Sequence, residues 1–178
     1  WYLTTFGRDG VDDAGMPVRT SVRYCKTSTA CPYANAYWDG TRSVFGAGYA
    51  TDDVVAHELT HGVTEHTAAL FYWHQSGAIN EAMSDIFGEL IDLATPGDDD
   101  PGDRWLIGED LAGGALRDMA DPTSVGDPDA MTSPAFYGGA LDGGGVHSNS
   151  GVANRAAVLM TDGGSLNGHS VAGIGPAK

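Results

Sequence analysis

The chain has 178 residues, 42% of them apolar, so it is long enough for one sizeable core or for two small lobes that meet at a cleft. Its 24 acidic and 9 basic residues give a net charge of −15, which repels nucleic-acid backbones and anionic lipid surfaces. It has no apolar run long enough to cross a bilayer, and it starts with neither a Met nor a charged leader. We therefore expect a globular protein without nucleic-acid or membrane partners, whose N-terminus has been processed or truncated.

The first third of the chain carries β signals. Residues 18–24 alternate between apolar or aromatic and polar side chains, which predicts a half-buried strand. Residues 35–38 and 41–45 flank Asp39-Gly40, a dipeptide that supplies the positive φ angles of a tight turn. We predict a β-hairpin there.

The two cysteines, Cys25 and Cys31, lie close together in the sequence. A short-loop disulfide is the favoured interpretation, and it would indicate an oxidising compartment. Two free buried thiols are the alternative, whereas a structural zinc site would need a second pair of Cys or His residues nearby.

Helical spacing follows in three places. Residues 53–70 have apolar residues four apart, and residues 150–161 form a third helix that a glycine at position 163 can cap. The second helix, residues 77–94, has apolar residues on one side (Ile79, Met83, Ile86, Leu90 and Leu93) and acidic residues on the other (Glu81, Asp85 and Asp92). The turn-rich stretch between residues 95 and 145 is expected to be irregular.

The first helix contains a metal-binding pattern. His57 and His61 lie four residues apart, so their imidazoles share one helical face and can bind one zinc ion. A catalytic zinc takes three protein ligands and leaves a position for water, and Glu81 on the next helix is the candidate third ligand. Asp85 lies one turn further on and can accept a hydrogen bond from His57, which would fix the imidazole tautomer. Glu58, beside His57, can take a proton from a zinc-activated water as the general base.

These motifs resemble a known family. The stretch from His57 to Asp85 is similar to the thermolysin family of neutral metalloproteases, and so are residues 35–38, 115–117, 144–151 and 171–175. Zinc proteases with a third histidine ligand need glycine at position 64 and histidine at position 67, and both positions hold threonine here. A related zinc aminopeptidase remains a minor alternative.

The resemblance implies an α+β fold, a two-lobed zincin-type core. Residues 1–76 would form a β-rich N-terminal lobe with the zinc-binding helix. Residues 77–178 would contain the second active-site helix, a metal-binding loop and the start of a C-terminal helical lobe that is only partly present. The implied activity is that of a secreted zinc endopeptidase, which cuts peptide bonds on the N-terminal side of bulky hydrophobic residues.

The resemblance also assigns roles to further residues. Tyr72 and His147 would stabilise the oxyanion, with Asp142 orienting His147. The residues predicted to bind substrate fall into three groups. Asn35, Ala36 and Trp38 belong to an edge strand that would pair with a peptide, and Val54 and Leu116 would line an apolar pocket. Arg117 would donate hydrogen bonds to a substrate carbonyl. A single structural calcium ion is predicted at Asp53, Asp92 and Glu109, with Asp103 and the Leu106 carbonyl as further ligands.

Two functional hypotheses follow. In the first, the chain is an active endopeptidase that acts on peptide or protein substrates, together with the remainder of its catalytic unit as a separate or missing segment. A proteinaceous inhibitor is a further candidate partner. In the second, the chain is a truncated, non-catalytic metal-binding fragment or binding module. His66, His74 and His169 are interpreted as structural, because their spacing does not match the zinc site.

Overall fold

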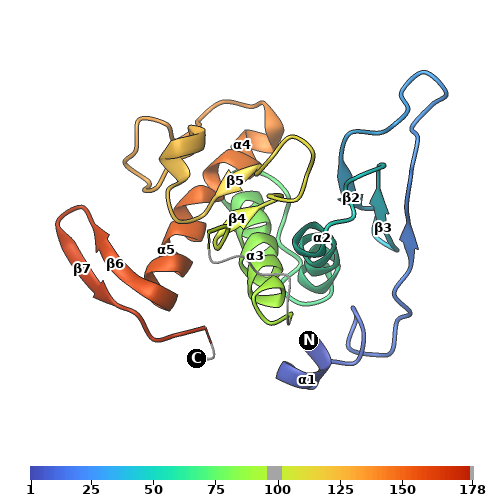
Figure 1. Cartoon of the computed structure of the whole chain (residues 1–178), viewed down its shortest axis with the longest axis horizontal. Helices are drawn as coiled ribbons and strands as arrows, with labels where there is room; N and C mark the ends of the chain where they lie inside the picture. The colour runs from blue at the N-terminus through green and yellow to red at the C-terminus, as the bar shows by residue number, and fades with distance from the viewer. Residues whose placement is uncertain (96–101, 177–178) are drawn as a thin grey trace.

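The computed structural model describes residues 1–95 and 102–176. Both helices and short strands occur along it, and α2 and α3 lie side by side at its centre (Figure 1). The elements in chain order are α1 (Tyr2–Phe6), β1 (Thr20–Ser21), β2 (Ala36–Trp38), β3 (Ser43–Phe45), α2 (Asp52–Glu65), α3 (His74–Asp92), β4 (Leu106–Ile107), β5 (Arg117–Asp118), the 3-10 helix η1 (Pro122–Val125), α4 (Asp142–Asn149), α5 (Gly151–Asp162), β6 (Gly163–Leu166) and β7 (His169–Ala172). The predicted α+β fold class is confirmed.

The three-stranded sheet has the order β1-β3-β2, with β3 parallel to β1 and antiparallel to β2. The predicted hairpin is present, with Ala36 opposite Phe45 and Gly40 at φ 91° in the turn. The predicted strand over residues 18–24 was wrong in extent, because β1 contains two residues and Val18 and Val22 are exposed. Alternating side chains form a buried face only where another layer packs against the strand. Among the described residues, no such layer covers Val18 and Val22. Strand β2 lies at the edge of the sheet.

Two small apolar clusters form the core. The first consists of Ala36, Phe45 and Val54, between the sheet and α2. The second lies beyond α3 and consists of Trp105, Ile107, Met119 and Val158, with Ile86 and Leu90 of α3 packed against it. The division of the chain at residue 76 stays a prediction, and α3 begins just before that point, at His74 rather than at the predicted residue 77.

Helices α2 and α3 pack closely because Gly88 faces α2. A Cβ atom at Gly88 would lie 3.1 Å from the backbone oxygen of Asp53 and 3.6 Å from Cβ of His57. The side of α3 toward the centre is polar, with Glu81, Asp85, Glu89 and Asp92 buried, whereas Ile79 and Met83 on its apolar side are 44% and 36% exposed. The interior of this helix pair is therefore built around carboxylates. Helix α2 ends at Glu65, five residues before the predicted end.

The segments outside the helix pair hold the remaining elements. Cys25 and Cys31 form the expected disulfide within the loop before β2. The stretch expected to be irregular contains, in its described part, the β4–β5 pair and η1, while its aspartate-rich run at residues 98–100 lies outside the described residues. Helix α5 ends at Asp162 with Gly163 as its C-cap, as predicted, and leads into the projecting β6–β7 hairpin (Figure 1). None of the helices in the described ranges is long and apolar enough to cross a lipid bilayer.

Candidate metal centre and active site

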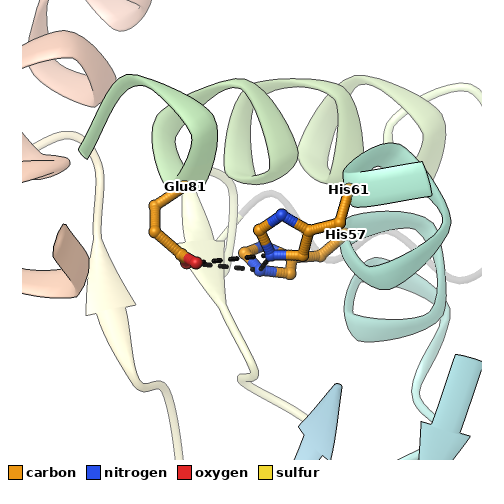
Figure 2. A group of neighbouring side chains, drawn as sticks. All are labelled: His57, His61 and Glu81. Atoms are coloured by element: carbon orange, nitrogen blue, oxygen red, sulfur yellow. Dashed lines mark hydrogen bonds and ion pairs between the residues drawn. The ribbon is translucent and has the colours of Figure 1, made fainter. Parts of the chain in front are cut away.

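Three predicted ligands converge between α2 and α3. His57 and His61 lie one turn apart on α2, and Figure 2 shows both rings and the Glu81 carboxylate pointing toward one another. Glu81 Oε2 lies 3.5 Å from His57 Nε2, and Glu81 Oε1 lies 3.3 Å from His61 Nε2. One ligand atom from each residue falls within 4.8 Å of the others. Two imidazole nitrogens and one carboxylate oxygen are a common donor set for catalytic zinc.

The charged groups around the three candidate ligands favour the binding of a cation. Burial raises the pKa of the Glu81 carboxyl group, but the two imidazoles outweigh this effect and hold it well below its usual value. Burial lowers the pKa of His57, but Asp85 and Glu81 raise it to about 10. Glu81 Oε2 is buried without a hydrogen-bond partner. A divalent ion would satisfy this oxygen and supply the positive charge that the surroundings favour.

Asp85 connects the metal centre to elements that follow α3 in the chain. Its Oδ1 lies 2.8 Å from His57 Nδ1, and its Oδ2 accepts hydrogen bonds from Arg117 Nε at 2.7 Å and Asn154 Nδ2 at 2.8 Å. Burial raises the pKa of Asp85, but Arg117 and His57 hold it well below its usual value. Sequence reasoning missed Asn154, because nothing in the spacing of α5 relates it to a residue 69 positions earlier.

His61 has a partner of its own. Its Nδ1 lies 2.8 Å from Asn80 Oδ1, so the His61 ring is oriented by the residue directly before Glu81 in the chain. Asn80 was also missed, although its position beside the third ligand was a signal that could have identified it. With Nδ1 engaged in each ring, Nε2 of both imidazoles is directed toward the metal centre.

Glu58 lies beside the ligands and lines the cleft described below. It is 6% exposed, and its Oε2 has no hydrogen-bond partner among the described residues. Burial raises the pKa of its carboxyl group, and the positive charge of His57 opposes this shift. A carboxylate with a raised pKa and an unoccupied oxygen is well suited to accept a proton.

Tyr72 and His147 approach the same point from the other side of the cleft. The Tyr72 hydroxyl donates a hydrogen bond to Glu81 and lies 3.3 Å from His147 Nε2. Burial raises the pKa of Tyr72, and the negative charge of Glu81 adds to this shift, so the hydroxyl stays protonated. Asp142 contacts His147 twice, with Oδ1 2.6 Å from Nδ1 and Oδ2 accepting from the backbone N–H at 3.0 Å. Both rings therefore present polar atoms to the metal centre.

Local backbone geometry holds Asp142 and His147 in this arrangement. The residues between them include Gly143, Gly144 and Gly145, which all have positive φ angles inside α4. A Cβ atom at Gly144 would lie 2.3 Å from Nδ1 of His74, so a larger residue would displace this turn. The three glycines bring the Asp142 carboxylate back onto the ring of His147, five residues further along the chain.

A cleft of about 720 Å³ opens over the metal centre. It is lined by all of the residues predicted to bind substrate, namely Asn35, Ala36, Trp38, Val54, Leu116 and Arg117. Arg117 donates hydrogen bonds to Asp85 through Nε and Nη2, and its predicted hydrogen bonds to a substrate carbonyl stay a prediction. The open edge of β2 and the apolar Val54 and Leu116 face the same space.

Comparisons with known proteins agree with this geometry. A family model described as "Thermolysin metallopeptidase, catalytic domain" matches residues 1–65, and one described as "Thermolysin metallopeptidase, alpha-helical domain" matches residues 68–178. The chain belongs to the thermolysin family. It is 47% identical to a zinc metalloproteinase of Renibacterium salmoninarum, 43% to bacillolysin of Bacillus cereus and 44% to thermolysin of Alicyclobacillus acidocaldarius, over 97%, 100% and 100% of this chain.

These thermolysin relatives are much longer proteins. The matched regions cover 33%, 32% and 33% of their lengths, so the chain spans about a third of each. Among solved structures, the precursor of protealysin, a metalloproteinase from Serratia proteamaculans, is similar with a TM-score of 0.70 and 36% identity, over 87% of this chain and 53% of that one. The family and the fold of this chain agree with the resemblance seen in its sequence.

The residues predicted to bind calcium surround the loop after α3. Asp53 is fully buried, and its Oδ1 accepts hydrogen bonds from the Thr51 hydroxyl at 2.7 Å and the Val54 N–H at 2.6 Å. Glu109 Oε2 is buried without a hydrogen-bond partner, Asp92 is buried, and Asp103 is exposed. Within residues 1–95 and 102–176, the three zinc-ligand candidates are the group close enough to hold a metal ion. The calcium site of this thermolysin-family chain therefore stays a prediction.

Proposed function

We propose that the chain is the catalytic core of a secreted zinc-dependent endopeptidase, which hydrolyses peptide bonds on the N-terminal side of bulky hydrophobic residues. The observation that carries the proposal is the convergence of His57, His61 and Glu81 beside the buried Glu58 carboxylate, inside a cleft with an open strand edge. The disulfide within the described residues supports an extracellular location, because such bonds persist in oxidising environments.

The residues around the metal centre would divide the chemistry among them. Zinc held by the three ligands would supply a Lewis acid that lowers the pKa of water toward about 7. Glu58 would accept the proton of the attacking water and pass it to the leaving amine. Tyr72 and His147 would donate hydrogen bonds to the oxygen on which negative charge develops. Asp85 and Asn80 would keep the two imidazoles in the required tautomers.

The cleft supports the proposed substrate class. An extended peptide can pair with the edge of β2, because β2 has a hydrogen-bonded neighbour on one side only. Such pairing recognises the peptide backbone and is largely independent of sequence. Val54 and Leu116 offer apolar surface, which favours a bulky hydrophobic side chain after the scissile bond.

The proposal is tested with the purified chain, its Glu58→Gln variant and Asp9→Asn as a matched control that removes an exposed carboxylate outside the cleft. Zinc content is measured by mass spectrometry, and cut sites are mapped in casein and in an N-acetylated peptide. We expect one zinc per chain in all three proteins and internal cuts before Leu, Ile or Phe with the wild type and Asp9→Asn. Activity should fall at least about 1000-fold in Glu58→Gln.

Each other outcome has a defined meaning. Cleavage of free peptides without cleavage of the N-acetylated peptide would indicate an aminopeptidase. Bound zinc without any cleavage would indicate a non-catalytic fragment. Equal activity in the wild type and Glu58→Gln would remove Glu58 as the general base.

We also propose a single structural calcium ion at Asp53, Asp92 and Glu109, with Asp103 and the Leu106 carbonyl completing the site. Two features support it: Asp53 and Asp92 are both buried, and Glu109 has an unpartnered buried oxygen. Carboxylate and carbonyl oxygens are the ligands that calcium prefers. Addition of millimolar calcium to the zinc-loaded chain should raise its melting temperature, and an unchanged melting temperature would contradict the site.

A further inference from the structure

One carboxylate in the cleft has no part in the mechanism proposed above. Glu65 is the last residue of α2, it lines the cleft, and it is exposed. Its Oε2 accepts a hydrogen bond of 2.7 Å from the indole N–H of Trp38, the last residue of the edge strand β2. The contact fixes the Glu65 side chain at the point where the edge of the sheet meets the end of the helix.

The packing of Trp38 on α2 makes this arrangement rigid. The indole ring lies against Gly62, where a Cβ atom would be 2.9 Å from Cζ2 of the ring, and Glu65 follows one turn later on the same face. Trp38 is therefore held on the backbone of α2 while its N–H reaches Glu65. The second carboxylate oxygen of Glu65 has no hydrogen bond among the described residues and is available to a ligand.

The electrostatic surroundings of Glu65 are negative. The C-terminal end of a helix carries partial negative charge, and a carboxylate placed there adds to it. The last turn of α2 contains no basic residue, and Glu65 forms no ion pair within residues 1–95 and 102–176. A cationic group of a ligand would therefore meet a carboxylate that is not already paired with a base.

From this juxtaposition we propose that Glu65 is a specificity-determining residue that selects peptides with a lysine or arginine side chain beside Trp38. A peptide paired with the edge of β2 runs past Trp38, and one of its side chains extends toward the Glu65 carboxylate. Its ammonium or guanidinium group then forms an ion pair with Glu65. The inference rests on the proposed peptidase function, and it adds the charge of a substrate residue to the apolar preference.

The test uses a series of N-acetylated peptides with one cut site, in which Lys, Gln or Glu is placed at each position in turn. For the wild type we expect kcat/KM about threefold to tenfold higher for Lys than for Gln at one position, and lower for Glu than for Gln at that position. The ratio of kcat/KM for the Lys peptide to that for the Gln peptide should fall toward one in Glu65→Gln. It should persist in Glu65→Asp, which keeps a carboxylate. Asp9→Asn, which removes the same charge outside the cleft, should keep the wild-type ratio.

Two further measurements separate this inference from the proposed function. The dissociation constants of the same peptides are measured with the Glu58→Gln protein, so binding is tested even if no peptide is cleaved. The preference for Lys should weaken in 1 M salt, because exposed ion pairs are screened. If the Lys and Gln peptides had equal kcat/KM values and equal dissociation constants at every position, the role of Glu65 would be overturned and the proposed function would stay intact. A Lys preference that survives in Glu65→Gln would overturn it as well.

Discussion

Asp85 and His57 come from different helices, 28 positions apart in the chain, and Asp85 Oδ1 lies 2.8 Å from His57 Nδ1. The same carboxylate also holds Arg117 and Asn154, which belong to elements beyond α3. Asp85 therefore orients a proposed zinc ligand and joins the two halves of the chain. Its replacement should affect metal binding and folding stability together.

Asp85→Asn should weaken zinc binding by about 10- to 100-fold, because the His57 ring loses the acceptor that fixes its tautomer. It should also lower the free energy of unfolding by about 3 kcal/mol, because the Arg117 guanidinium, whose side chain is only 13% exposed, loses its counter-charge. Zinc affinity is measured by competition with a chelator, and stability by urea unfolding of the metal-free protein. Wild-type zinc affinity in a folded Asp85→Asn protein would contradict this role.

His147→Ala should lower kcat by about 100- to 1000-fold with little change in KM, because a donor to the oxyanion acts mainly in the transition state. Asp142→Asn should lower kcat by a smaller factor. Asparagine keeps the size of the side chain and only weakens the contact that orients the His147 ring. Steady-state kinetics on a peptide substrate give both values, and zinc content serves as the control for folding. A His147→Ala protein with a raised KM and an unchanged kcat would show that His147 serves binding instead.

Glu109 should make the metal-free chain less stable as the pH rises. Burial, followed by the negative charge of Asp53, raises the pKa of Glu109 from 4.5 to about 7. Between these two values the folded state binds more protons than the unfolded state, so the free energy of unfolding falls as pH increases from about 4.5 to 7. Melting temperatures at pH 5 and pH 7, recorded with a chelator present, should show a smaller difference in Glu109→Gln than in the wild type.

The size of the Glu109 effect is limited by solvent, because the side chain is only partly buried. An identical pH dependence in the wild type and Glu109→Gln would show that another group is responsible. Asp9→Asn, which removes an exposed carboxylate far from Glu109 in the sequence, is the matched control.

Gly62→Ala should destabilise the chain although alanine is the better helix former by about 1 kcal/mol. A Cβ atom at Gly62 would lie 2.6 Å from Cγ1 of Val11 and 2.9 Å from Cζ2 of Trp38, so the indole must move. We expect a net loss of about 1–2 kcal/mol by urea unfolding and a weaker preference for Lys peptides. At Gly113 an added Cβ meets nothing within 4 Å, so Gly113→Ala should have little effect. A Gly62→Ala protein more stable than the wild type would contradict the packing argument.

The two histidines of the metal centre could be predicted from the sequence alone, because the spacing of His57 and His61 is a local property of one helix. The hairpin around Asp39-Gly40 was predictable for the same reason, since a two-residue signal sets the turn. The candidate third ligand, Glu81, could be predicted because it lies about one helix length beyond His61, a separation that lets the chain turn back and bring the two helices together.

Which side chains meet across long separations in the chain could be seen only after the fold was known. It joined Asp85 to Arg117 and Asn154, and it placed Glu65 beside Trp38. It also shortened the predicted strand at residues 18–24, because alternation of side chains has no consequence without a layer to cover one face. Local spacing therefore identifies ligands within a helix, whereas the partners that orient them depend on packing between elements, which no single segment of the sequence contains.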